Sequence, residues 1–454
     1  MHIGGVALFK GPAPDHRELL AHVEHRLDVV PRFRQKLADL PFGLIRPWWI
    51  DDPDFNLDYH MRRSSLPRPG TQKQLQTMVG RIFSQRLDRA RPLWEMYVVE
   101  GLEGDRFALF TKAHHALVDG ISGVDLASVI LDIDPEPVEP DNQLEPWLRH
   151  PAPSRADLLA RGIIDSLRTP VALAEEAFAA LAYPTRLRHR VRTLTEALGS
   201  VGSQLLDPAP ALPLNGPIGP HRRFESRHVS LDAVKEIKRR HDATVNDVVL
   251  ATVTGALRSW LQGRGTDTEG LEVRALVPVN LRGENERGLL GNRVALLRAS
   301  LPVYEDDPDK RLTIVKSTMS ELKRSRQLAA AETIIELSDF APPTILAQAS
   351  RLNFSTRLFN LIVTNVPGPQ VPLYLLGREL ETIAPIAFLP EGHGLAVAIF
   401  SYNGTISFGL LGDRERMYDL DTLAEGLEAS IDAWDATAGP SGRAKGGPRP
   451  APVG

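Results

Sequence analysis

Residues 106–134 constrain the fold more than any other part of the chain, because they read as a strand, a turn and a helix in direct succession. Apolar side chains fill both alternating faces of the segment that ends at His115, which predicts a buried strand. Asp119 and Gly120 interrupt this run, and from Ile121 apolar residues recur at helical spacing. We therefore expect an α/β protein with mixed sheets, in which the connection after a buried strand opens into a cleft.

His114 and His115 stand at the end of that strand, and an imidazole is the side chain whose ordinary pKa best suits proton abstraction near neutral pH. Neighbouring residues of a strand point to opposite faces, so only one of the two rings can enter a given cleft. Asp119 can hold the following loop, and Gly120 permits a tight turn. Two alternatives remain on these residues alone, a pair of structural histidines and a metal site. The metal site is disfavoured because the rings diverge and no helical H-E-x-x-H pattern occurs.

Composition excludes several classes of protein. A length of 454 residues favours two domains, and a formal net charge of −4 offers no basic footprint for a nucleic acid. The chain has no cysteine, which removes disulfides, thiolate metal sites and a cysteine nucleophile. It also has no G-x-S-x-G, G-x-G-x-x-G or P-loop pattern. No apolar run has the length of a membrane span and the N-terminus lacks a signal-peptide pattern, so we expect a cytoplasmic location.

Two proline-rich passages divide the chain, one over residues 134–157 and one over residues 207–220, with a mostly helical region between them. The resulting prediction has four parts: an N-terminal domain over residues 1–134, a Pro-rich and helical linker region over 135–221, a C-terminal domain over 222–436 and a disordered tail over 437–454.

Local patterns predict further elements in the first half. Residues 1–10 read as a strand, and a helix follows the Gly-Pro-Ala-Pro turn as far as about Leu37. Trp94 begins another strand, a position at which a tryptophan most often packs in a core.

The second half contains a strongly apolar helix and a hairpin. Residues 245–260 predict a helix that is buried over most of its surface, with Asn246 and Asp247 at its N-terminal end. Asp247 can cap the free backbone N–H groups there. Asn403 and Gly404 separate two strand-like runs and predict a two-residue hairpin turn.

Several of these segments together resemble one family. HHALVDG, residues 114–120, is similar to the HHxxxDG signature of the CoA-dependent acyltransferase superfamily. The other matching segments, in chain order, are PLW (92–94), Asn-Asp (246–247), PVNLR (278–282), LGN (290–292) and NVPGP (365–369). The ordered set resembles the bacterial wax ester synthase/diacylglycerol acyltransferase branch over about residues 1–436. In that family a segment precedes the first strand, so we expect that the chain starts late or has been trimmed.

The resemblance implies two chloramphenicol-acetyltransferase-like domains that form a pseudo-dimer with a channel between them. It implies an O-acyltransferase that moves a long-chain acyl group from acyl-CoA to diacylglycerol, to a long-chain alcohol, or to both. Acyl-CoA would be a co-substrate, with no permanently bound cofactor and no metal. A lipid acceptor is compatible with peripheral contact at the inner membrane or at lipid droplets, and the oligomeric state stays open.

The resemblance also implies roles for individual residues. His115 would be the general base that accepts the hydroxyl proton, and Asn246 would donate to the oxyanion, with Thr364 or Asn365 as second candidates. The expected channel residues are Trp94, Thr364 and Asn365. The expected supporting residues are His114, Asp119, Gly120, Asp247 and Arg282, of which Asp119 and Arg282 would form an ion pair.

Three alternative functions remain at this stage. One is an acyltransferase that esterifies a polyketide or glycolipid alcohol, and another is a condensation-type amide-forming enzyme. The third is a non-catalytic lipid-droplet binding protein with the same fold.

Overall fold

The computed structural model describes residues 1–38, 47–118, 129–136, 207–280, 294–324 and 354–437, with a few single positions between 148 and 160. The helix expected from Ile121 and the helical region expected within the linker lie outside these residues. Within them, no helix is both long enough and apolar enough to cross a bilayer.

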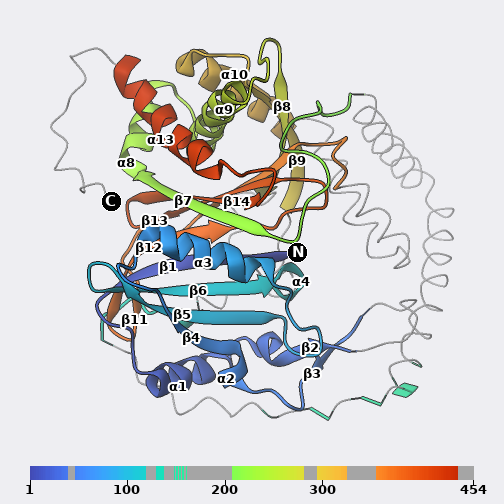
Figure 1. Ribbon diagram of the computed structural model, residues 1–454, viewed down its shortest axis with the longest axis vertical. Helices are drawn as coiled ribbons and strands as arrows, with labels where there is room; N and C mark the ends of the chain where they lie inside the picture. The colour runs from blue at the N-terminus through green and yellow to red at the C-terminus, as the bar shows by residue number, and fades with distance from the viewer. Residues whose placement is uncertain are drawn as a thin grey trace, which may run out of the picture.

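Two six-stranded sheets, each mixed in strand direction, form the two layers of the molecule (Figure 1). The first sheet has the order β11-β12-β1-β6-β5-β4 and contains β1 (His2–Lys10), β4 (Met61–Ser65), β5 (Trp94–Leu102), β6 (Arg106–His114), β11 (Tyr374–Leu375) and β12 (Arg378–Ile386). The second has the order β7-β14-β13-β10-β8-β9 and contains β7 (Arg222–Ser230), β8 (Glu272–Asn280), β9 (Val294–Pro302), β10 (Leu361–Pro367), β13 (Leu395–Tyr402) and β14 (Thr405–Asp413). A small separate sheet pairs β2 (Gln35–Leu37) with β3 (Trp49–Asp51). The mixed α/β fold class predicted from the sequence is confirmed.

Helices pack on both sheets. In the first half these are α1 (His16–Arg26), α2 (Leu57–His60), α3 (Gln72–Ser84) and α4 (His115–Val118), with a 3-10 turn, η1 (Pro31–Arg34), and α3 lies between the first sheet and the second half (Figure 1). In the second half they are α8 (Leu231–Arg240), α9 (Val245–Gly263), α10 (Pro308–Arg324) and α13 (Leu420–Thr437). Figure 1 shows α9, α10 and α13 on the face of the second sheet that is turned away from the first.

The first helix is shorter than the sequence predicted. It ends at Arg26 rather than near Leu37, and η1 and β2 occupy the remainder. Two β-branched residues, Val29 and Val30, precede Pro31, and the residue before a proline is driven out of the helical region.

Strand β6 forms the centre of the first sheet, between β1 and β5. Alternate residues such as Phe107 and Leu109 pack in a cluster with α1, whereas Ala108 and Phe110 pack in a cluster with α3. Both faces of β6 are therefore buried, as its apolar alternation predicted. The hairpin of the second sheet is confirmed too, since β13 and β14 are joined through Asn403 and Gly404, both with positive φ.

The division of the chain by sequence position does not coincide with the division into sheets. Strands β11 and β12 come from the C-terminal half, yet β12 pairs antiparallel with β1 and extends the first sheet. The chain then returns to the second sheet at β13. Residues 374–386 thus belong structurally to the first half, and the connection from β12 to β13 crosses between the layers.

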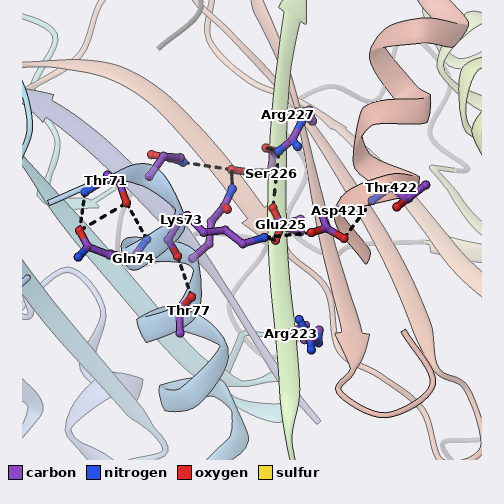
Figure 2. A network of polar contacts seen from close by, with 12 residues as sticks. Thr71, Lys73, Gln74, Thr77, Arg223, Glu225, Ser226, Arg227, Asp421 and Thr422 are labelled. Atoms are coloured by element: carbon purple, nitrogen blue, oxygen red, sulfur yellow. Dashed lines mark hydrogen bonds and ion pairs between the residues drawn. The ribbon is translucent and has the colours of Figure 1, made fainter. Parts of the chain in front are cut away.

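A polar network also ties the two halves together (Figure 2). The Lys73 ammonium of α3 donates to Glu225 of β7 at 2.7 Å and to Asp421 at the start of α13 at 3.4 Å. The carboxylate of Glu225 is buried and also lies 3.6 Å from Arg227. Helix α3 is thereby fixed to both a strand and a helix of the second half.

Candidate active site

Strand β6 carries the two histidines of the motif to the region where the halves meet. The strand ends at His114, and His115 is the first residue of the short helix α4. The expected strand was therefore one residue too long. The chain turns here because Leu117 is fully buried in the core of the first half, while the His115 backbone N–H donates to the Met1 carbonyl oxygen at 3.0 Å.

The half-buried His115 ring faces an aromatic cluster of the second half. Its centroid lies 5.3 Å from that of Phe388 in an edge-to-face arrangement, with an interplanar angle of 76°. Phe388 belongs to the connection between β12 and β13 and packs against Phe354 and a buried group that includes Phe359 and Ile362. A side chain of the first half and a wall from the second half thus meet at His115.

His114 has different surroundings. It lines a cavity of about 630 Å³, lies edge-to-face with His2 at 6.2 Å, and its Nδ1 accepts a hydrogen bond from the Ala116 backbone N–H at 3.2 Å. Burial, with smaller effects from the terminal amine, His115 and Arg89, lowers the pKa of His114 to about 4. This cavity therefore adjoins His114, and the cleft expected beside His115 stays a prediction.

Two predicted site residues of the second half form a pair. Asn246 lies in the first turn of α9, and its Oδ1 accepts a hydrogen bond from Asn365 Nδ2 of β10 at 3.3 Å. Thr244 and Asp247 form a capping box, in which the Asp247 carboxylate accepts from the Thr244 backbone N–H at 2.8 Å. The capping role expected for Asp247 is confirmed, and this cap fixes the turn that carries Asn246.

Alternation along β10 separates the candidate oxyanion donors. Val363 packs in the core beneath α9, whereas Ile362 packs in the cluster that contains Phe388. Since successive side chains of a strand point to opposite faces, Thr364 shares the side of Ile362, and Asn365 shares the side of Val363. Thr364 therefore lies on the face of the second sheet that is turned toward His115, while the Asn246–Asn365 pair lies on the α9 side.

Trp94 supports the site from inside the core. Its side chain is buried, its indole N–H donates to the Phe33 carbonyl oxygen at 2.8 Å, and its ring stacks on His60 at 4.6 Å. His60 in turn bonds to the Trp94 carbonyl oxygen at 2.8 Å. The ring packs as expected for a tryptophan at the start of a strand, so we assign it a supporting role for β5.

Three predicted residues, Asp119, Gly120 and Arg282, lie outside the described residues, and the expected ion pair between Asp119 and Arg282 stays a prediction. In the described part of the chain, no group of three or more His, Asp or Glu side chains is placed to hold a metal ion.

The sequence did not point to His2 or Phe388. His2 lies opposite His114 in the antiparallel pair of β1 and β6. This register could be found from the sequence by aligning the two strands as antiparallel neighbours. Phe388 lies in an irregular connection without any periodic pattern. Only the crossing of the chain from β12 to β13 brings it to the histidine.

Known families and proteins match this chain over most of its length. The family model described as the wax ester synthase/diacylglycerol acyltransferase catalytic domain matches residues 1–249, and that of the WS/DGAT C-terminal domain matches residues 290–434. A probable diacylglycerol O-acyltransferase, tgs1 of Mycobacterium tuberculosis, is 33% identical over 437 residues, which cover 94% of this chain and 90% of that protein. O-acyltransferase WSD of Acinetobacter baylyi is 30% identical over 451 residues, with 96% of this chain and 93% of that protein covered.

Solved structures show the same fold. The wax ester synthase/diacylglycerol acyltransferase from Marinobacter aquaeolei VT8 superimposes with a TM-score of 0.68 at 27% identity, covering 97% of this chain and 95% of that one. The starter condensation domain of rhizomide synthetase superimposes with a TM-score of 0.56 at 15% identity, covering 96% and 90%. The second likeness concerns the fold alone.

Proposed function

This chain belongs to the wax ester synthase/diacylglycerol acyltransferase family, and from that premise we propose that it transfers an acyl group from acyl-CoA to the hydroxyl of diacylglycerol or of a long-chain alcohol. The products are triacylglycerol or a wax ester together with free CoA. The proposal includes a general base, His115, and no covalent acyl-enzyme.

The position of His115 carries the proposal. Its ring stands at the end of β6, against Phe388 of the second half, so both halves contribute to its surroundings. Two substrates that approach from different sides of a pseudo-dimer can meet at such a place. The apolar cluster around Phe388 suits the alkyl chains of a lipid substrate, because it offers them a surface away from water.

His115 is a better candidate for the base than His114. A general base is most effective when its pKa lies near the working pH, and burial lowers the pKa of His114 to about 4. The Ala116 backbone N–H also occupies Nδ1 of His114. His114 therefore supports the end of the strand in this proposal.

The chemical step is a direct acyl transfer. His115 accepts the hydroxyl proton while the alcohol oxygen attacks the thioester carbonyl carbon. The tetrahedral intermediate then collapses with cleavage of the C–S bond, and the imidazolium returns the proton to the departing CoA sulfur. The ester forms without an oxidant, a reductant or a further reactant.

The oxyanion of the intermediate needs a hydrogen-bond donor. Asn246 is one candidate, from its match to the family motif, although it lies on the α9 side of the second sheet, where its Oδ1 accepts a hydrogen bond from Asn365. Thr364 is the second, because its side of β10 faces Phe388. Loss of the true donor costs about 100- to 1000-fold in rate.

A thiol-release assay with acyl-CoA tests the proposal. We expect free CoA to appear with diacylglycerol or hexadecanol as acceptor, with the matching ester as product. His115→Ala should abolish transfer and leave the melting temperature within a few degrees of the parent protein. Near-normal turnover in this variant would refute the assignment of the base, and the absence of any ester from the parent protein with either acceptor would refute the function.

A further inference from the structure

The cavity beside His114 lies between the two halves and is not used by the proposed chemistry. Phe83 and Leu87 line it from the end of α3 and the loop that follows, and Leu389 and Leu411 line it from the second half. Its volume of about 630 Å³ is in the range of small-molecule sites.

In the described structure, the charged side chains that line the cavity are all cationic. Arg86, Arg89 and Arg222 all line the cavity, and among the residues that the structure describes no carboxylate does. Arg222 is already engaged, since its Nη1 donates to the Gly219 carbonyl oxygen at 2.6 Å and lies 3.5 Å from an Asp413 carboxylate oxygen. Arg86 and Arg89 are exposed, and within the described chain neither forms an ion pair. Two guanidinium groups at this cavity are therefore available to an anion.

Away from the arginines, the side chains that line the cavity are uncharged. Most of its remaining lining is aliphatic or aromatic. His2 and His114 also line it, and burial as the main cause lowers the pKa of these residues to about 3 and about 4, so both rings are neutral at pH 7. The cavity thus combines a cationic part with an apolar part and matches a ligand that carries anionic groups on a long, uncharged arm.

The cavity is also adjacent to the candidate base. Leu389 lines the cavity, and the preceding residue, Phe388, contacts the His115 ring. The two histidines are likewise consecutive on the opposite wall. On each wall, the residue that lines the cavity is followed or preceded in the chain by a residue of the His115–Phe388 contact.

From this arrangement we propose that Arg86 and Arg89 bind the phosphate groups of the acyl-CoA donor, and that the cavity holds the arm that leads to the thioester. This inference rests on the proposed function, because it assigns a place to the donor of that reaction. Guanidinium groups form strong charge-assisted hydrogen bonds with phosphate oxygens. The acceptor needs no phosphate and so should not depend on either arginine.

Paired donors test the assignment. Decanoyl-CoA carries the phosphates, whereas decanoyl-N-acetylcysteamine presents the same thioester without them. We expect Arg86→Glu and Arg89→Glu each to raise the KM for decanoyl-CoA about tenfold or more, as expected for one lost charge-assisted bond. The KM for decanoyl-N-acetylcysteamine and for hexadecanol should change less than twofold. Added salt should reproduce the effect on decanoyl-CoA in the parent protein.

Arg81→Glu is the matched control, since Arg81 is an exposed arginine of α3 that does not line the cavity. An equal KM increase in the control, or an equal increase for both donors, would overturn the assignment, because it would indicate a general charge effect or a structural one. An increase confined to a diacylglycerol acceptor in anionic phosphatidylglycerol vesicles would place the arginines at a lipid surface and overturn it too. If the parent protein uses neither donor, the proposed function fails. If the variants are active with an unchanged KM for decanoyl-CoA, only the assignment of the arginines fails.

Discussion

Replacement of Gly4 by alanine should destabilise the protein through the strand pair that leads to the active site. Gly4 of β1 lies opposite Lys112 of β6, and a Cβ at this position would stand 1.9 Å from the Thr111 carbonyl oxygen. Real Cβ atoms essentially never come within 3.0 Å of such an atom, so the two strands would have to separate locally by about 1 Å. Hydrogen bonds of ordinary length do not survive a separation of that size.

The magnitude follows from two costs. Overpacking in a dense interior costs about 1 to 3 kcal/mol, and two weakened ladder hydrogen bonds cost about 1 kcal/mol each. We therefore expect Gly4→Ala to lower the free energy of unfolding by about 3 to 5 kcal/mol, a large share of the roughly 5 to 15 kcal/mol of a typical domain. Activity should fall in the fraction that stays folded, because Met1, directly before β1, provides the carbonyl oxygen that accepts from the His115 backbone N–H.

The neighbouring glycine provides the control. A Cβ at Gly5 would meet the Ala384 carbonyl oxygen at 3.5 Å, an ordinary contact. Alanine is favoured over glycine in a strand by about 0.5 to 1 kcal/mol, so Gly5→Ala should be neutral or slightly stabilising. Urea unfolding, followed by circular dichroism and by fluorescence of the buried tryptophans, measures both variants. A Gly4→Ala protein within about 0.5 kcal/mol of Gly5→Ala would show that the strands accommodate the methyl group and would refute this reasoning.

Three further predictions concern the site and the contact between the halves. In the folded protein the pKa of His114 is about 4, whereas in the unfolded chain a histidine takes up a proton near pH 6.5. The free energy of unfolding should therefore fall as the pH drops from 6.5 to 4. His114→Asn should make this fall smaller, as measured by urea unfolding at a series of pH values. Lys73→Met leaves the buried carboxylate of Glu225 without its 2.7 Å partner and should lower the free energy of unfolding by about 1 to 2 kcal/mol; an unchanged urea midpoint would mean that the remaining contacts suffice. Of Thr364→Val and Asn246→Ala, the variant that removes the oxyanion donor should lose about 100-fold or more in kcat with little change in KM, and equal small losses would exclude both residues.

Local structure could be predicted where one segment determines it. The strand before the histidines shows its two faces by alternation, and residues on the two faces, such as Phe107 and Phe110, are found in separate cores. Asn403 and Gly404 both adopt positive φ, a requirement of the hairpin turn that this dipeptide predicts. Asp247 completes a capping box with Thr244, three residues earlier. Each of these outcomes depends on interactions within a few residues.

Two errors have similar local causes. The first helix is shorter than predicted because apolar spacing continues past Arg26, whereas Pro31 restricts the backbone of the residue before it. The strand was extended to His115 because alternation alone cannot show that Leu117 is drawn into the core and starts a turn there.

Long-range pairing was beyond the sequence. Nothing in the pattern of residues 378–386 indicates that this strand pairs with β1 rather than with its neighbours in the second half. Its apolar residues would suit either sheet, and strand partners are decided by the global arrangement of the chain. The cavity beside His114 could not be foreseen for the same reason, since Leu389 lies on this crossover and Leu411 on β14 of the second sheet.

The connection from β12 to β13 supplies the residues of the second half that surround the histidine motif. Because β12 is hydrogen-bonded into the first sheet and β13 into the second, the connection between them must pass from one layer to the other, and Phe388 and Leu389 lie on it. One of these neighbours contacts His115 and the other lines the cavity of His114, so two consecutive residues of the second half face two consecutive residues of the first. The motif by itself supplies only the imidazoles. Part of the wall around each ring comes from a segment more than 270 residues later in the chain. A piece limited to residues 1–134 would therefore contain the motif but would lack β12, Phe388 and one side of the cavity.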